Sequence, residues 1–285
     1  MILGFHAGSL LLHDESSVCQ ELSSLGFTAV AIRPRLGALD PSNKRITEQC
    51  MRLGAVAKQC GLTVIVDTEG RYIADPRRSR WPSLASRDSG EANKRIALIR
   101  HWLDLADEIG CSVATFTSGL LGHPADESDL ERLAARIDQL TATVPDGVKI
   151  ALHPMVGDAI PTVSHFERLK QWLGDESRIW VAADVGEMLR GGEFPVGDRL
   201  ARNLDDLACV YLCEPDSGQS RDCRIGHGEV DFSRIVLSLK KSGYQGPMVI
   251  RVDGHHERGF ELAVEALAKL ESSKHTQQAI RGSKP

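Results

Sequence analysis

The stretch of sequence that decides the fold is IALIRHWLDLADEIGCSVATFT, residues 96–117. In its first half Ile96, Ile99 and Leu103 recur at the spacing of one face of an amphipathic helix. Gly110 stands where a glycine commonly ends a helix, and a short apolar run follows at once. The pattern predicts a helix that leads directly into a buried β-strand.

The same alternation extends along the chain in both directions. A doubly wound open sheet would normally have fewer strands, and its first turn often carries a glycine-rich phosphate-binding sequence that His6-Ala7-Gly8-Ser9 does not match. Strands that alternate with helices favour a parallel sheet, and eight repeats favour closure into a barrel. We therefore predict an α/β fold, a (β/α)8 TIM barrel. Its strands are expected at residues 2–6, 28–33, 62–67, 112–117, 148–153, 179–184, 208–213 and 247–252.

Residues that begin and end helices agree with these limits. Ser128 with Glu131, and Ser164 with Glu167, have the spacing of a capping box at a helix start. The sixth helix, near residues 196–206, has the weakest pattern. Glycines expected to end helices stand before four of the predicted strands, at Gly26, Gly61, Gly110 and Gly243.

Composition excludes several classes of protein. The chain has 285 residues, 42% of them apolar, which suits one domain over residues 1–271 and a polar, disordered tail over 272–285. A net charge of −5 argues against a nucleic-acid partner bound through bulk positive charge. No apolar run is long enough to span a membrane. Seven scattered cysteines without a C-x-x-C pair favour free thiols in the cytoplasm.

Polar side chains end nearly every predicted strand. In a (β/α)8 barrel the carboxyl ends of the strands form the active-site face. Because burying unpaired charges is costly, a ring of them favours a shared polar pocket over a plain core. The ring comprises His6, Arg33 or Arg35, Asp67 with Glu69, Thr117, His153, Asp184 with Glu187, Tyr211 with Glu214, and Arg251 with Asp253.

Alternation along the strands sharpens this prediction. Successive side chains of a strand point to opposite faces, so residues two apart share a face. If Asp184 faces the barrel axis, His153, Tyr211 and Arg251 on the neighbouring strands converge on it. Arginines also follow the third strand, Arg71 among them, and suit a phosphate or a carboxylate. For most of these loop arginines, a solvated position or an ion pair with Glu69 or Asp75 is the simpler interpretation.

Several stretches together carry a family resemblance. They are GVKIALH at residues 147–153, VAADVGE at 181–187, IGHGEVDF at 225–232 and GYQGPMVI at 243–250. DPRRSRWP at 75–82 adds to them. The chain resembles the xylose-isomerase-like barrels, which include sugar-phosphate isomerases, ketose 3-epimerases and relatives of endonuclease IV. The resemblance covers nearly the whole chain.

The resemblance implies a divalent metal held by Glu, Asp, His and Glu on strands five to eight. Here His153 stands at the first position, Asp184 keeps the second, and Glu187 replaces a histidine that normally follows three residues later. Tyr211 and Arg251 stand at the seventh- and eighth-strand positions. One divalent ion (Mn, Mg, Co or Zn) on His153, Asp184 and Glu187 stays open.

Three functions remain in competition. The first is a sugar, sugar-phosphate or hydroxy-carbonyl isomerase or epimerase, with His153 as base, Arg251 as oxyanion partner, and Asp184 and Glu187 orienting the base or acting as base themselves. The second is a non-catalytic barrel that binds a sugar-like ligand or works within a complex, because most usual metal ligands are replaced. An endonuclease IV-like nuclease is the third and least supported.

The resemblance and the strand ends together predict the residues that bind substrate. Arginines before the G-x-G sequence are frequent in similar chains, which places Arg221 and Arg224 among them. A small sugar-like substrate is the expected partner, and pairing into a homodimer is compatible with this class of barrel. The predicted substrate-binding set is His6, Asp67, Arg71, Tyr211, Arg221, Arg224 and His227.

Overall fold

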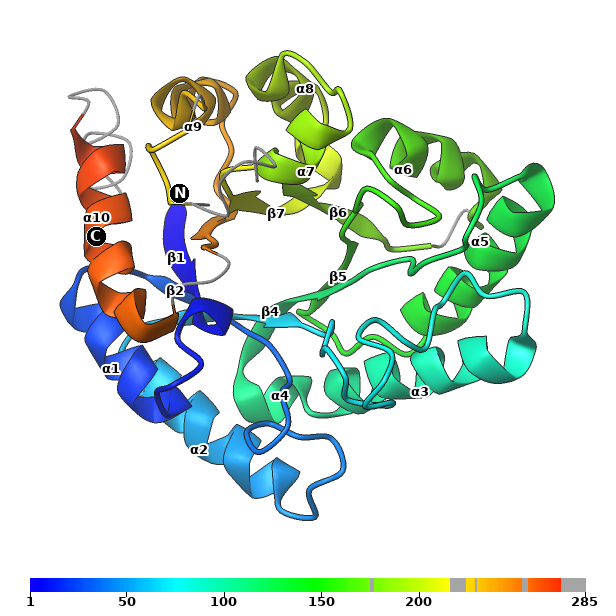
Figure 1. Ribbon diagram of the computed structural model, residues 1–285, viewed down its shortest axis with the longest axis horizontal. Helices are drawn as coiled ribbons and strands as arrows, with labels where there is room; N and C mark the ends of the chain where they lie inside the picture. The colour runs from blue at the N-terminus through cyan, green and yellow to red at the C-terminus, as the bar shows by residue number, and fades with distance from the viewer. Residues whose placement is uncertain (175–176, 216–223, 229, 253–255, 273–285) are drawn as a thin grey trace.

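Eight parallel strands close into one barrel in the order of the sequence, and β8 pairs with β1. This computed structural model describes residues 1–174, 177–215, 224–228, 230–252 and 256–272. The predicted (β/α)8 barrel is confirmed (Figure 1). Its strands are β1 (Ile2–His6), β2 (Ala29–Ile32), β3 (Thr63–Asp67), β4 (Cys111–Phe116), β5 (Lys149–Leu152), β6 (Trp180–Asp184), β7 (Leu207–Leu212) and β8 (Pro247–Ile250).

Helices form a ring around the strands, and their buried sides pack on the barrel (Figure 1). The weakly predicted sixth helix, near residues 196–206, is present as α8 followed by a 3-10 turn, and a further short helix, α7, precedes it. The helices are α1 (Glu15–Ser24), α2 (Ile46–Gln59), α3 (Ser89–Asp104), α4 (Ala106–Ile109), α5 (Glu127–Thr141), α6 (Val163–Leu169), α7 (Val185–Arg190), α8 (Val196–Arg202), α9 (Phe232–Lys241) and α10 (Gly259–Glu271). Single 3-10 turns lie at Ala7–Ser9, Lys170–Trp172, Leu204–Asp206 and His256–Arg258.

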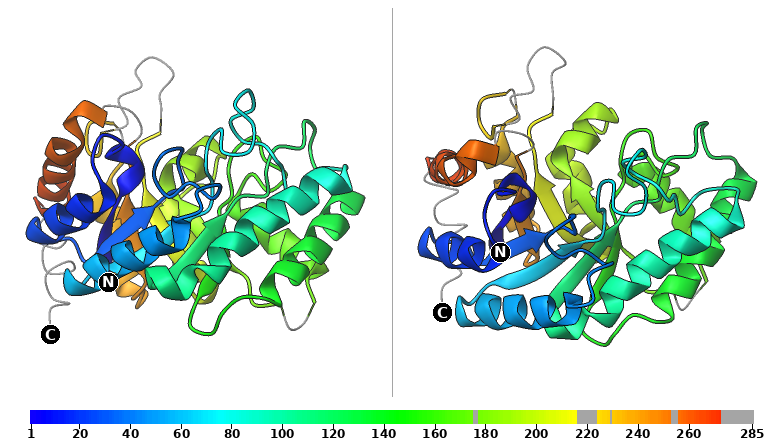
Figure 2. Two further views of the ribbon diagram at one scale, coloured as in Figure 1. Left: turned by 90° about the horizontal axis from the view of Figure 1, so that it is seen from below. Right: turned by 60° about the horizontal axis from the view of Figure 1, so that its bottom comes forward.

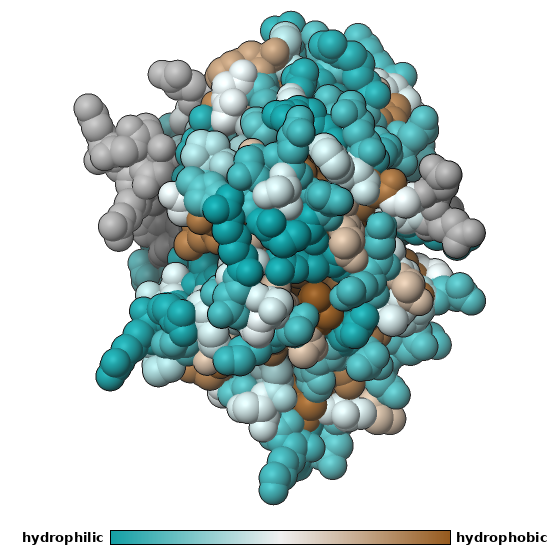
Figure 3. Space-filling view, turned by 90° about the vertical axis from the view of Figure 1, so that its right-hand side faces the viewer, coloured by the Kyte–Doolittle hydropathy of each residue, from teal (hydrophilic) through white to brown (hydrophobic). Residues whose placement is uncertain are grey.

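The outer surface of this ring is polar. Figure 3 shows the side of the molecule that carries α3, α5 and α6, where hydrophilic residues cover most of the surface and apolar ones lie in separate spots. This arrangement follows from the amphipathic spacing of the helices, which turns their apolar faces toward the strands. Within the described part of the chain, none of the helices combines the length and the apolar character that crossing a membrane requires.

The interior of the barrel is built from unusually small side chains. Ala29, Ala31, Ala151 and Ala182 point inward from three strands, and Tyr211 is the largest of the buried side chains in this interior cluster. Layers of bulky branched residues commonly fill such barrels. Small residues here leave room for Tyr211 and for the polar groups at the mouth.

Close contact between β1 and β2 needs a glycine. Gly4 pairs with Ala29, and a Cβ added at Gly4 would lie 2.9 Å from the Ala29 Cβ. Two side chains at this distance cannot coexist without a shift of one strand. Gly4 therefore lets the first two strands approach on the inner face.

The four glycines predicted to end helices all have a positive φ, from 68° at Gly61 to 96° at Gly26, which confirms them as termination points. The two predicted capping boxes were wrong by two residues. Asp126 begins α5 in a reciprocal box with Asp129, and Thr162 begins α6. The serines at 128 and 164 already lie inside the first turn. Carboxylates cap as well as hydroxyls do, so the spacing alone selected the wrong register.

The loops that follow the strands gather at one end of the barrel. In the left view of Figure 2 the N-terminus lies at the lower end, and the long loop after β3, drawn in cyan, rises from the upper end. Parallel strands that start at the bottom deliver all their carboxyl ends to the top. This upper end is the mouth of the barrel.

Candidate active site at the mouth of the barrel

A buried group of arginine, aspartate and histidine lies at the ends of β5, β6 and β8. Arg251 Nη1 is 3.1 Å from Asp184 Oδ2, and His153 Nε2 is 3.6 Å from the same oxygen. The other oxygen of Asp184 accepts the backbone N–H of Glu187 at 3.0 Å, which starts α7. The predicted convergence of His153 and Arg251 on Asp184 is therefore present in the structure.

A second group of the same composition lies at the ends of β1, β2 and β3. Arg33 donates to Asp67 Oδ2 from Nε at 2.9 Å and from Nη2 at 2.7 Å. His6 Nε2 is 3.4 Å from that oxygen, and His6 Nδ1 accepts the backbone N–H of Gly8 at 2.9 Å. Because Nδ1 accepts a hydrogen bond, the proton of the neutral ring resides on Nε2 and points to Asp67.

Tyr211 contacts both groups from β7. Its ring stacks on His153 with 5.0 Å between centroids, and the His6 ring lies 6.1 Å away in a tilted arrangement. The Arg251 guanidinium carbon lies 5.9 Å from the centre of the Tyr211 ring. The phenol oxygen is 3.3 Å from Thr115 Oγ1. Tyr211 thus joins the two groups into one centre.

Charge in this centre is fixed by burial and by the arginines. Burial alone would raise the pKa of Asp184, but the positive charge of Arg251 and the contact with His153 outweigh it and hold that pKa at about 2. Asp67 is likewise held well below its usual pKa by Arg33 and His6 against the effect of burial. Burial lowers the pKa of His6, which keeps its ring neutral. Both aspartates are therefore ionised at neutral pH.

The donor set does not fit the metal that the family resemblance implies. Arg251 occupies the free side of Asp184, and a fixed cation there would repel a divalent ion. The Glu187 carboxylate accepts the backbone N–H of Val156, at 2.9 Å, and pairs with Arg190 of the same helix. Over the described ranges, no three His, Cys, Asp or Glu side chains form a group able to hold a metal. His153, Asp184 and Glu187 are thus not assembled as one ligand set.

Glu69 belongs to a separate ionic network below the loop after β3. Its carboxylate contacts Arg95 at 2.8 Å, Thr117 at 2.7 Å and Arg80 at 3.3 Å, and Arg80 continues to Asp158 at 2.7 Å. The expected ion pair of a loop arginine with Glu69 is confirmed for Arg80. The network anchors the loop.

The buried carboxylate of Glu214, just after β7, supports the G-x-G loop. Gly228 donates its N–H to Glu214 at 3.1 Å, and burial raises the pKa of this glutamate while hydrogen bonds from the loop backbone oppose the rise. A Cβ at Gly228 would lie 2.6 Å from Glu214 Oε2, so only glycine lets the loop approach this closely.

The remaining predicted substrate residues have mixed outcomes. His6, Asp67 and Tyr211 lie in the centre, whereas Arg71 is exposed beside it. His227 is exposed in the G-x-G loop, and Arg224 is partly exposed. Arg221 and Asp253 lie outside the described residues, as does most of the predicted tail.

One partner of the centre escaped prediction, and a second was predicted only as one of two alternatives. Thr115 lies in the middle of an apolar strand, where a single threonine gives no signal. Arg33 was one of two candidates two residues apart, because the end of β2 could not be fixed to one residue. In the structure Arg33 forms an ion pair with Asp67, whereas Arg35 forms one with Glu15 at 2.9 Å.

Known proteins resemble this chain in sequence and in fold. Residues 19–273 match the family model of the xylose isomerase-like TIM barrel. A Haemophilus influenzae protein that carries the name of an L-ribulose-5-phosphate 3-epimerase is 22% identical over 181 residues. That match covers 61% of this chain, which spans about three fifths (62%) of the relative's length.

Solved structures of epimerases share the fold. L-ribulose 3-epimerase superposes with a TM-score of 0.76 at 16% identity, covering 100% of this chain and 99% of that one. D-allulose 3-epimerase from Methylomonas sp. gives 0.75 at 18%, covering 95% and 97%. The 3-keto-D-glucoside 4-epimerase of E. coli gives 0.75 at 17%, covering 96% and 100%. The family match spans most of the sequence, and the chain belongs to the xylose isomerase-like TIM barrel family.

Proposed function

We propose that this protein is a sugar isomerase or epimerase in which the Arg251 guanidinium takes the electrostatic role of a metal ion. The observation that carries the proposal is the buried group in which Arg251 and His153 both face one oxygen of Asp184. Family membership and the epimerase names of similar proteins support the reaction class.

The reaction removes a proton from a carbon next to a carbonyl. The His153 imidazole takes the proton, the C–H electron pair forms a carbon–carbon double bond, and the carbonyl π pair moves to its oxygen. Arg251 stabilises the negative oxygen of this enediolate. Delivery of a proton from water to the opposite face of the same carbon, with release of the His153 proton to solvent, epimerises the sugar. Return of the proton by His153 to the neighbouring carbon, with transfer of the hydroxyl proton between the two oxygens, isomerises it. Arg251 and His153 lie within reach of one ligand because both contact Asp184.

His153 suits the role of base better than Asp184 does. The pKa of Asp184 is held at about 2, so its carboxylate is a weak base at neutral pH. Nε2 of His153 is buried and, within the described residues, has no hydrogen-bond partner. Asp184 orients His153 and favours the imidazolium that forms when the ring accepts the proton.

The test is exchange of substrate C–H for solvent deuterium, followed by NMR with L-ribulose, D-allulose and L-ribulose 5-phosphate. We expect exchange at a carbon beside the carbonyl of at least one ketose. His153→Gln should slow it by about 10²–10⁴-fold, and Arg251→Met by about 10²–10³-fold. Arg45→Ala, an exposed arginine paired with Glu48 on the surface, is the control that keeps the wild-type rate.

Two outcomes would contradict the proposal. Exchange that is unchanged in both variants would remove His153 and Arg251 from the chemistry. Binding of a ketose with no exchange in the wild-type protein would favour the non-catalytic barrel, which the replaced ligand positions also allow.

A further inference from the structure

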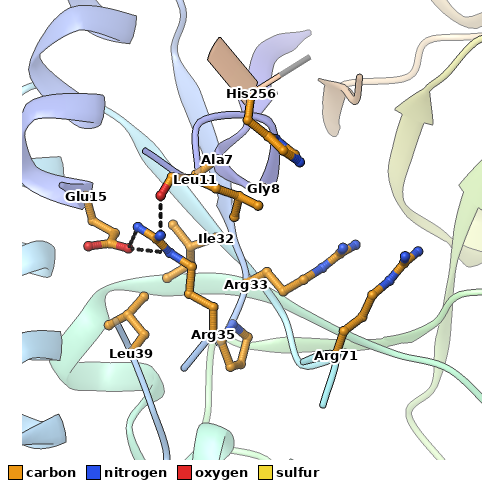
Figure 4. A pocket seen from close by; sticks show the side chains of 11 residues that line it. Ala7, Gly8, Leu11, Glu15, Ile32, Arg33, Arg35, Leu39, Arg71 and His256 are labelled. Atoms are coloured by element: carbon orange, nitrogen blue, oxygen red, sulfur yellow. Dashed lines mark hydrogen bonds and ion pairs between the residues drawn. The ribbon is translucent and has the colours of Figure 1, made fainter. Parts of the chain in front are cut away.

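A cavity of about 320 Å³ opens beside the centre, between the loops that follow β1, β2 and β3 (Figure 4). Its volume lies at the small end of the range for ligand pockets, which suits a group of a few heavy atoms joined to a small sugar. Three arginines line it, and among the described residues of the lining Glu15 is the one acidic side chain. The charged and polar part of the lining is Glu15, Arg33, Arg35, Arg71 and His256.

The three arginines differ in the hydrogen bonds and ion pairs that they form with the protein. Arg35 is held by Glu15 at 2.9 Å and by the backbone carbonyl of His13 at 3.0 Å, so its role is to fix the loop. Arg33 holds Asp67 from the other side of the cavity. Arg71 is exposed and makes no hydrogen bond or ion pair with any residue that the structure describes.

The cavity therefore carries excess positive charge in a chain whose net charge is −5. In Figure 4 Arg33 and Arg71 extend in the same direction, whereas Arg35 turns away toward Glu15. His256 enters from the opposite wall. Guanidinium groups bind phosphates and carboxylates through paired hydrogen bonds, and such charge-assisted bonds are about twice as strong as neutral ones.

We propose that this cavity is the subsite for an anionic group of the substrate, a phosphate or a carboxylate, with Arg71 as the residue that contacts it first. The inference rests on the proposed function, because it assigns the substrate class of the same site. The substrate would then be an acidic sugar rather than a neutral one.

Contacts lead from the cavity to the centre without interruption. Arg33 lines the cavity and contacts Asp67 at 2.7 Å, Asp67 faces His6, and His6 lies against Tyr211. Arg33 thus links the anion cavity to the buried centre. Arg33 serves both parts, so its removal would disturb Asp67 and is unsuitable as a test.

The experiment is calorimetric titration of the wild-type protein, Arg71→Gln and Arg77→Gln with inorganic phosphate and, separately, acetate. Arg77 lies on the same loop, is exposed, and is outside the cavity lining, which makes it a matched control. We expect binding by wild type and Arg77→Gln, and binding weakened about tenfold or more in Arg71→Gln. Tighter binding of phosphate identifies a phosphate subsite, and tighter binding of acetate a carboxylate subsite.

Equal affinities in wild type and Arg71→Gln, or binding of neither anion by wild type, would overturn the subsite. The deuterium-exchange assay separates this failure from failure of the proposed function. Exchange of L-ribulose and L-ribulose 5-phosphate with equal KM would reject a phosphate subsite and leave the enzyme intact. Anion binding that depends on Arg71 without exchange of any ketose would keep the subsite and reject the enzyme.

Discussion

Asp184 joins three parts of the mouth. One oxygen begins α7 through the N–H of Glu187, and the other faces both Arg251 and His153. Its carboxylate is fully buried, so its negative charge is compensated by Arg251 in a medium that screens little. Changes at this residue should therefore affect stability as well as chemistry.

Asp184→Asn leaves the Arg251 charge buried beside a neutral amide. We expect the free energy of unfolding to fall by about 3–5 kcal/mol, measured by urea denaturation. The exposed pair Lys170 and Asp206 supplies the control, because Asp206→Asn should cost less than about 1 kcal/mol. Adding Arg251→Met to Asp184→Asn should recover part of the loss. A loss for Asp184→Asn as small as that of the control would contradict a buried ion pair.

The residues that face the centre were predictable where side chains alternate along a strand. Asp184, Tyr211 and Arg251 face inward because each lies on an inner-face position near the end of its strand. Glu187 was expected to act with them, but it lies beyond the strand in the first turn of α7, where helix geometry sets its direction. Alternation along a strand carries no information once the chain has turned into a helix.

At the scale of elements, helix starts depend on single side chains. Thr162 begins α6 by accepting the N–H of His165 at 3.3 Å, and its hydroxyl also lies 2.7 Å from His165 Nδ1. The two strands on either side, β5 and β6, carry His153 and Asp184. The position of α6 thus supports the part of the barrel that holds the candidate base.

Thr162→Ala removes this cap. We expect it to lower the free energy of unfolding by about 1 kcal/mol, because one backbone donor at the start of α6 loses its partner. Thr162→Ser keeps the hydroxyl and should stay close to wild type in the same urea titration. If the alanine variant is as stable as the serine variant, the cap contributes nothing to α6.

The positions of the strands were largely predictable, but the first residues of two helices were not. All eight strands lie within one residue of expectation at their starts, because short apolar runs between helical patterns leave few alternatives. The starts of α5 and α6 were missed because Asp126 and Thr162 compete with nearby serines for the same role. Which of the neighbouring side chains caps the helix depends on how the chain enters the helix. The spacing of residue types carries no information about that path.

At the scale of the whole molecule, the mouth concentrates buried carboxylates. The pKa of Asp184 is held at about 2, and the pKa values of Asp67 and Glu69 are also lowered, each by arginines that outweigh burial. A buried ring of paired charges links loops from most of the barrel. Folding of the mouth and protonation of these groups should therefore be coupled.

Acid should unfold the protein through these groups. An unfolded aspartate binds its proton near pH 3.8, above the folded value for Asp184, so acid favours the unfolded chain. The stabilisation from Asp184, about 2 kcal/mol, is complete above about pH 4 and is lost as the pH falls toward 2. Urea denaturation at several pH values should show this slope in wild type and a shallower one in Asp184→Asn/Arg251→Met. Equal slopes would remove Asp184 from the acid transition.

The central claim is that Arg251, rather than a divalent ion, stabilises the oxyanion. The most direct measurement is the deuterium-exchange rate of the wild-type protein before and after treatment with a chelator, with Mn²⁺ added back in a third sample. The account predicts the same rate in all three samples, and loss of exchange in His153→Gln. A rate that falls on chelation and returns with Mn²⁺ would contradict it and assign the chemistry to a metal.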